Sequence, residues 1–202
     1  MRFETISDFF PDWQMAVQFG LWSIFGIVWL VMWGRTRRQR DPEAFVSESN
    51  YNGTLYLTLP ISLVIWKSGL GQWEANPSWL KNLGLIISAV GLGLAVVARF
   101  VLGHYWAFHA AGHREGEFLE TFPYNLVRHP IYGGQLLLCL GTSLSSGNVG
   151  VLLVLTGGTY LLQLQRARRE EAMLDRLTGG AYGKRFRAKG RFLPRLLPRR
   201  SG

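Results

Sequence analysis

Long apolar runs separated by short polar segments dominate this chain, and there are five of them: Met15–Trp33, Leu55–Leu70, Leu80–Leu102, Ile131–Leu144 and Val149–Leu164. The first has the length of about 20 residues that a membrane-spanning helix needs, and the third is long enough as well. The last two are shorter and are joined by the tight turn Ser145–Asn148, which predicts a helical hairpin. We therefore expect an all-α integral membrane protein of about five transmembrane helices.

Proline and glycine inside the apolar runs fit this picture. Pro60 interrupts the second run, which a membrane helix tolerates when a neighbour satisfies the freed carbonyl group. Gly84, Gly91 and Gly93 lie in the third run. Small residues let helix backbones approach closely in a membrane, so another helix is expected to pack against this one.

The charge of +9 is concentrated beside the apolar runs. Four arginines follow the first run, at positions 35, 37, 38 and 40, and many Lys and Arg residues follow Leu164. Positive charge next to membrane segments marks the cytoplasmic side and attracts anionic lipid, so no nucleic-acid partner is expected. The pattern predicts a bacterial inner (cytoplasmic) membrane protein with its N-terminus outside. Its basic C-terminal segment is then cytoplasmic and faces the anionic phospholipid leaflet.

Arg128, His129 and Pro130 stand at the mouth of the fourth apolar run. Proline suits the first turn of a helix, where its missing N–H group costs nothing. The free N–H groups of that turn and the helix dipole favour an anion, and Arg128 and His129 add donors. The site therefore suits a carboxylate or phosphate. The alternative is that Arg128 is a membrane anchor and His129 a capping residue.

Glu170 and Glu171 follow the last apolar run. Carboxylates at this depth are costly unless they are paired, so a cationic partner is expected. Arg166 stands four residues before Glu170 and is one candidate partner. A ligand ammonium group or a ribose diol is the other.

The remaining metal-ligating residue types point to no metal site. His104, His109 and His113 lie between the third and fourth runs, but only the last two are spaced four residues apart. Cys139 is the only cysteine, so the chain has no internal disulfide, and its apolar surroundings indicate a small buried side chain.

Taken together, RHPIYGG at 128–134, the short hairpin, EE at 170–171, AY at 181–182 and RFLP at 191–194 resemble the membrane-integral S-adenosylmethionine-dependent methyltransferases. This superfamily includes the isoprenylcysteine carboxyl methyltransferases and the phosphatidylethanolamine N-methyltransferases. The resemblance runs from about Leu80 to Pro194. It implies a methyltransferase core over residues 80–202, with two N-terminal transmembrane helices and a basic loop in residues 1–79.

The resemblance also implies roles for particular residues. It places the cofactor S-adenosylmethionine against the backbone near Leu126 and against His129, Pro130, Tyr132, Glu170 and Glu171, with Arg128 as a further candidate by its position. Tyr182 and Arg191 match tail positions that close the pocket or meet the substrate, and with Glu171 they are the catalytic candidates. Two positions depart from the family pattern: Phe122 stands where many relatives have glycine, and Arg185 where a second tail tyrosine is usual.

The expected function is methyl transfer to a lipophilic membrane substrate. The acceptor is either a phospholipid amine or an isoprenylcysteine-like carboxylate or thiol. An amine would have to lose a proton first, to Glu171 or to a histidine of the 103–128 connector. Two alternatives stay open, an NADPH-dependent enzyme resembling sterol reductases and a membrane scaffold without catalysis.

Overall fold

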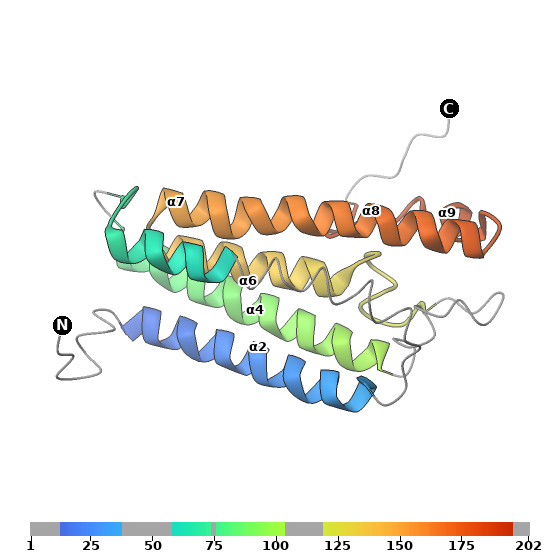
Figure 1. The fold of residues 1–202 in the computed structure, drawn as a ribbon, viewed down its shortest axis with the longest axis horizontal. Helices are drawn as coiled ribbons and strands as arrows, with labels where there is room; N and C mark the ends of the chain where they lie inside the picture. Colours follow the sequence, from blue (N-terminus) through green and yellow to red (C-terminus); the bar gives the residue numbers. More distant parts are fainter. Residues whose placement is uncertain (1–12, 38–57, 74–75, 104–118, 196–202) are drawn as a thin grey trace.

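The computed structural model describes residues 13–37, 58–73, 76–103 and 119–195, and in these the regular secondary structure is all helical (Figure 1). The helices are α2 (Trp13–Arg37), α4 (Ser78–Leu102), α6 (Pro130–Ser146), α7 (Val149–Val151), the π-helical η1 (Leu152–Gly158), α8 (Thr159–Leu177) and α9 (Ala181–Phe186). Residues 58–68 form a further helix. The all-α prediction is confirmed for these residues.

Two helices are long and apolar enough to cross a membrane by length and composition, namely α2 over Trp13–Met32 and α4 over Ser78–Leu102. Both contain runs predicted as spans. Of the other three predicted runs, the second is helical over residues 58–68 and ends in a turn, and the last two are helical throughout. The crossing of the membrane by all five runs stays a prediction, and so does their orientation.

The last helix is longer than expected. The hydropathy pattern placed its end at Leu164, but α7, η1 and α8 form one continuous helical rod from Val149 to Leu177 (Figure 1). The change from apolar to charged residues alters the surroundings of a helix without breaking it. In addition, Arg166 and Glu170 form an i,i+4 ion pair that favours helix in this segment.

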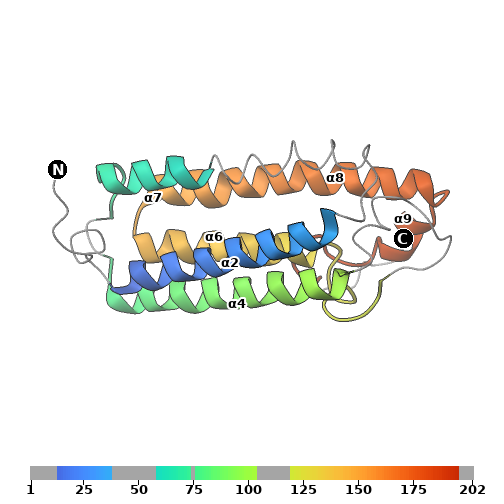
Figure 2. The same cartoon turned by 60° about the horizontal axis from the view of Figure 1, so that its bottom comes forward.

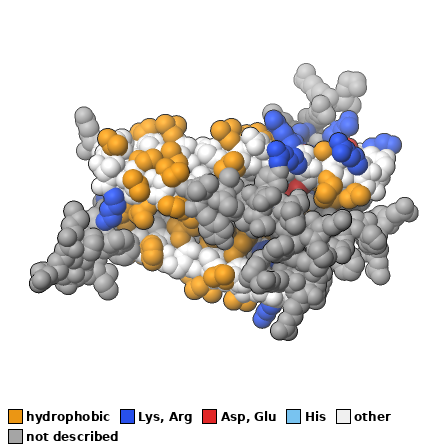
Figure 3. All heavy atoms as spheres, viewed as in Figure 1, with side chains coloured by type: hydrophobic (Ala, Val, Ile, Leu, Met, Phe, Trp, Pro, Cys, Tyr) orange, Lys and Arg blue, Asp and Glu red, His pale blue; other side chains and the backbone are white. Residues whose placement is uncertain are grey.

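α2 and α4 run in the same direction along the bundle, α6 runs in the opposite direction, and α8 again runs in the direction of α4 (Figures 1 and 2). As a result, the start of α6 and the far end of α8 lie at the same end of the molecule, together with α9. Figure 3 shows most of the visible Lys and Arg side chains at that end, and hydrophobic side chains along the rest of the described surface. Arg168, Arg176 and Lys184 are among the exposed cations of α8 and α9.

Helices α4 and α6 approach each other so closely that side chains are excluded. A Cβ atom at Gly91 would lie 2.5 Å from the backbone nitrogen of Leu138 and 2.6 Å from the carbonyl oxygen of Gly134. Gly84 makes an equally close approach to α6. The predicted glycine contact is therefore confirmed at Gly84 and Gly91. It is wrong at Gly93, where a Cβ atom would meet nothing within 4 Å.

Polar side chains tie α2 to this pair of helices. Gln18 Nε2 of α2 donates to the hydroxyl groups of Ser88 in α4 and Ser145 in α6, at 2.9 and 3.0 Å. Trp22 Nε1 donates to Thr142 of α6 at 3.0 Å. Such interhelical hydrogen bonds hold helices together where apolar surroundings give no hydrophobic drive for association.

Candidate functional site

The C-terminal tail lies along the segment that leads into α6. The backbone N–H of Arg128 donates to the carbonyl of Gly190 at 3.0 Å, and that of His129 to the carbonyl of Arg191 at 2.9 Å. Pro130 then begins α6, as predicted. A Cβ atom at Gly133 would lie 2.6 Å from the carbonyl oxygen of Phe192, so the tail backbone rests directly on the first turn of α6.

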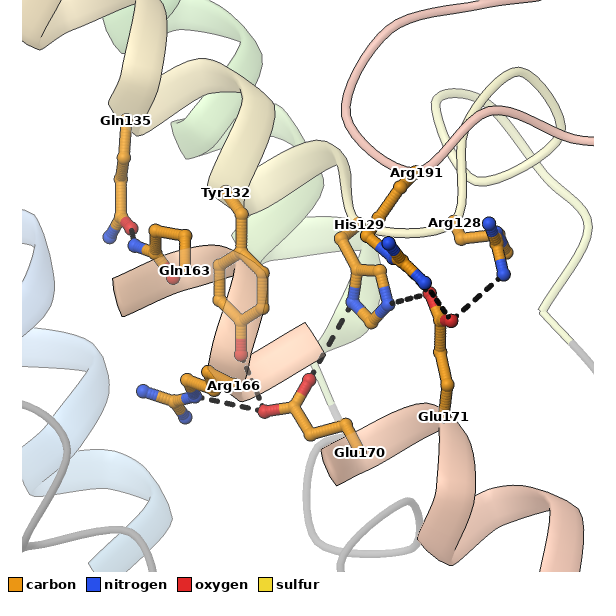
Figure 4. Close-up of polar contacts among 9 residues, drawn as sticks. All are labelled: Arg128, His129, Tyr132, Gln135, Gln163, Arg166, Glu170, Glu171 and Arg191. Carbon is orange, nitrogen blue, oxygen red and sulfur yellow. Dashed lines mark hydrogen bonds and ion pairs between the residues drawn. The ribbon is translucent and has the colours of Figure 1, made fainter. Parts of the chain in front are cut away.

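Three cationic or titratable side chains surround Glu171 of α8 (Figure 4). Arg191 binds it through two hydrogen bonds, from Nε at 2.9 Å and from a terminal nitrogen at 2.7 Å. A terminal nitrogen of Arg128 lies 2.9 Å from Oε2, and His129 Nε2 lies 3.0 Å from Oε1. The tail, the start of α6 and the end of α8 are thus joined at one carboxylate.

These contacts fix the charge of Glu171. Burial alone would raise the pKa of its carboxyl, but the hydrogen bonds from Arg191 and His129 and the charge of Arg128 lower the pKa to about 2. The same hydrogen bond raises the pKa of Arg191. At neutral pH this group is a fixed anion that organises the cations around it.

Glu170 has a second set of partners, which among the described residues shares only His129 with that of Glu171. The Tyr132 hydroxyl donates to Oε1 at 2.5 Å, and Arg166 Nε donates to the same oxygen at 2.9 Å. His129 Nδ1 lies 3.6 Å from Oε2. The His129 and Tyr132 rings are stacked, with centroids 5.3 Å apart and planes 4° from parallel. Through its two ring nitrogens, His129 therefore lies between both carboxylates (Figure 4).

The partners of the two carboxylates differ in part from expectation. The i,i+4 pair between Arg166 and Glu170, one of the two alternatives, is confirmed. Arg128 and His129 contact Glu171, whereas the sequence suggested that they face the anion of a ligand. Arg128 nevertheless keeps a donor, because its Nε is buried and has no hydrogen-bond partner among the described residues.

Tyr182 and Leu126, two further predicted site residues, differ in burial. Tyr182 of α9 is buried with its ring 5.0 Å from that of Phe186, and burial together with the charge of Glu171 raises its pKa. Tyr182 is therefore close enough to the cluster to interact electrostatically with Glu171. The side chain of Leu126 is 48% exposed, which is compatible with the predicted role for its backbone alone. Arg185, which departs from the family pattern, forms a surface ion pair with Glu120, with 2.7 Å between its Nε and Glu120 Oε1.

Phe192 of the tail was missed by sequence reasoning. Its ring lies edge-on to three others, with centroid distances of 6.4 Å to His129, 6.4 Å to Tyr132 and 6.1 Å to Tyr160. Gln135 and Gln163 were missed as well. The spacing of Gln163, Arg166 and Glu170 places them on one helical face, and this could have indicated that Gln163 lies beside the site.

The structure describes one histidine of the four, His129. The connector histidines at 104, 109 and 113 lie outside the described residues. Within the described part of the chain, no group of three or more His, Cys, Asp or Glu side chains is arranged to hold a metal ion.

Comparison with known proteins gives three relatives. The cobalt-zinc-cadmium resistance protein CzcN of Cupriavidus metallidurans is 29% identical over 133 residues, 66% of this chain and 56% of that protein. The nickel-cobalt-cadmium resistance protein NccN of Alcaligenes xylosoxydans xylosoxydans is 24% identical over 124 residues, 61% of this chain and 55% of that protein. The methanethiol S-methyltransferase of Pseudomonas sp. (strain GM41(2012)) is 23% identical over 163 residues, 75% of this chain and 61% of that protein.

The chain thus spans somewhat over half the length of these relatives. A sequence model of the phospholipid methyltransferase family matches residues 79–185, which is just over half of the chain. The match begins with α4 and takes in α6, α8 and both carboxylates of the cluster. The chain belongs to the phospholipid methyltransferase family.

Proposed function

We propose that this protein is an integral-membrane methyltransferase that transfers a methyl group from S-adenosylmethionine to a lipophilic acceptor. The observation that carries the proposal is the meeting of the start of α6, the end of α8 and the tail at His129. This residue lies 3.0 Å from Glu171 and 3.6 Å from Glu170. Family membership and the methanethiol S-methyltransferase relative support the reaction class.

The polar groups of the cluster fit those of the cofactor. The buried Nε of Arg128, which no described residue contacts by a hydrogen bond, is a donor for the cofactor carboxylate. The side chain of Glu170 is 33% exposed, and its Oε2, which lies 3.6 Å from His129 Nδ1, suits the uncharged ribose diol. When bound, S-adenosylmethionine supplies an electrophilic methyl group on a sulfonium centre.

The chain itself contributes positioning more than acid–base chemistry. Methyl transfer is an in-line displacement, and correct placement of the reactants supplies much of its acceleration. With its pKa lowered to about 2, Glu171 is a poor proton acceptor at neutral pH. We therefore infer that Glu171 holds Arg128, His129 and Arg191 in position. It does not take the general-base role that the sequence left open.

We infer the class of methyl acceptor from the relatives and from the apolar helices around the site. The family description points to a phospholipid head group, and the methanethiol enzyme to a thiol. A lipophilic acceptor reaches the cluster from the bilayer if the apolar helices span it, as α2 and α4 are long enough to do. The two metal-resistance relatives are named for a different role, and their names specify no methyl acceptor.

Calorimetry on the full chain in detergent tests the proposal. We expect S-adenosylhomocysteine to bind and NADPH not to bind. His129→Ala and Glu171→Ala should each weaken that binding at least about tenfold, whereas Glu120→Gln, in the surface pair with Arg185, should leave it unchanged. Radiolabelled S-adenosylmethionine and a total lipid extract then identify the acceptor. Binding of NADPH alone, or unchanged affinity in both alanine variants, would overturn the assignment.

A further inference from the structure

A pair of glutamine side chains lies beside the cluster, further from the tail. Gln163 Nε2 of α8 donates a short hydrogen bond to Gln135 Oε1 of α6. Gln135 is three residues after Tyr132, and Gln163 is three residues before Arg166. One helical turn therefore separates the amide pair from the Tyr132–Glu170–Arg166 contacts, and Figure 4 shows the two amides meeting between the helices.

The amide pair has hydrogen-bonding capacity to spare. Each glutamine amide offers two N–H donors and a carbonyl acceptor, and the contact between them uses one donor and one acceptor. The described residues supply neither side chain with a further hydrogen bond, so Gln135 Nε2 and Gln163 Oε1 stay open. Gln135 is only 8% exposed. Neither Gln135 Nε2 nor Gln163 Oε1 is one of the fully buried polar atoms that lack a partner, so both are accessible at the surface and can hydrogen-bond to a polar ligand.

The charged groups nearest to the pair are already neutralised. Arg166 is bound to Glu170 and also lies over the Tyr132 ring, 5.3 Å from its centroid. Glu170 in turn accepts the Tyr132 hydroxyl. A ligand carboxylate or ammonium at the amides would have to compete with these contacts, whereas an uncharged protic group would not.

The surroundings suit an apolar chain attached to that head group. Tyr160 of α8 is 45% exposed and contacts Phe192 edge-on, on the same helix as Gln163. Leu153 and Leu161 continue the exposed apolar surface of this rod. An acceptor with a hydrocarbon tail can therefore lie along α8 while its head reaches between α8 and α6.

We propose that Gln135 and Gln163 bind the uncharged, protic head group of the methyl acceptor, with an alkyl thiol as its simplest form. On methylation the thiol sulfur would gain the methyl group as the bond from that methyl group to the cofactor sulfonium breaks. The thiol proton would pass to solvent water, and S-adenosylhomocysteine would be released. The inference rests on the proposed function and narrows its substrate class. It assigns the two glutamines to acceptor binding, as specificity-determining residues, and leaves the cofactor to the carboxylate cluster.

The test compares the wild type with the double variant Gln135→Leu/Gln163→Leu, which removes both amides together so that neither is left buried alone. Gln165→Leu is the matched control, because Gln165 is an exposed residue of the same helix. The probes are 1-dodecanethiol, dodecanoate and dodecane in detergent micelles. We measure thermal stabilisation by each probe without cofactor, the KM and kcat for probe methylation, and the affinity for S-adenosylhomocysteine.

The wild type should be stabilised by dodecanethiol more than by dodecane or dodecanoate. In the double variant, the KM for dodecanethiol should rise about tenfold, as expected for the loss of about one hydrogen bond's worth of binding. Its affinity for S-adenosylhomocysteine should change less than twofold. Gln165→Leu should resemble the wild type in every measurement.

Three results would overturn the inference. An unchanged KM would make the pair purely structural, a parallel loss of S-adenosylhomocysteine affinity would assign it to the cofactor, and a preference for dodecanoate would contradict an uncharged head group. If the double variant does not fold, the probe preference of the wild type still decides. If the wild type fails to bind S-adenosylhomocysteine, the proposed function itself is wrong, and stabilisation by dodecanethiol alone still tests the amide pair.

Discussion

His129 Nε2 lies 3.0 Å from Glu171 Oε1, although 42 residues separate the two along the chain. Because His129 precedes the first residue of α6 and Glu171 lies near the end of α8, this contact joins two helix ends that enclose the site. Arg191 binds the same carboxylate from the tail. Glu171 is therefore the point at which three segments of the chain are held together.

We expect Glu171→Gln to loosen this junction. The substitution keeps the size of the side chain but removes the charge that compensates Arg128, Arg191 and His129. Hydrogen bonds to charged groups contribute about 1.5–3 kcal/mol each, so a loss of about 2 kcal/mol of unfolding free energy is expected. Thermal unfolding in detergent measures it. Glu120→Gln is the control, because Glu120 is exposed and its pair with Arg185 is accessible to solvent and salt.

The stability of the junction should fall in acid. The folded-state pKa of Glu171, about 2, is below its ordinary value of 4.5, so the carboxylate form is favoured by folding. Its contribution is fully present above about pH 4.5 and is lost as the pH falls toward 2. Melting temperatures measured between pH 7 and pH 3 should drop less in Glu171→Gln than in the wild type. Parallel curves for the two proteins would contradict this account.

The features of this site that could be predicted from the sequence are those set by spacing within a single helix. Pro130 at the first turn of α6 and the Arg166–Glu170 pair follow from spacing within one helix, and both are confirmed. Phe192 and the contact of Gln135 with Gln163 depend on which helices become neighbours. A single sequence does not contain that information, since the facing residues are far apart in the chain.

The helix boundary at Leu164 illustrates a different limit. Hydropathy reports the environment of a residue, whereas helix continuation depends on backbone hydrogen bonds and on the absence of a breaking residue. No glycine or proline lies between Leu164 and Leu177, so the helix continues past the apolar run. That continuation brings Glu170 and Glu171 to the start of α6.

The contact between α4 and α6 predicts a difference between two neighbouring glycines. Gly91→Ala places a methyl group 2.5–2.6 Å from backbone atoms of α6, which cannot move aside as a flexible side chain would. Overpacking of this kind costs about 1–3 kcal/mol. Gly93→Ala adds the same methyl group to the same helix but meets nothing within 4 Å. The melting temperature in detergent should fall for Gly91→Ala alone, and equal values would show that the helices do not pack through this surface.

Gly133→Ala should release the tail from the first turn of α6 while leaving the helical bundle folded. The added Cβ atom would lie 2.6 Å from the carbonyl oxygen of Phe192, so the tail backbone has to move away. That displacement weakens the backbone hydrogen bonds from Arg128 and His129 to the tail, and it moves Arg191 away from Glu171. We therefore expect faster cleavage by trypsin after Arg187 and at least about tenfold weaker binding of S-adenosylhomocysteine, with little change in helix content by circular dichroism. Gly93→Ala again serves as the control, and cleavage at the wild-type rate in Gly133→Ala would show that the tail does not depend on this contact.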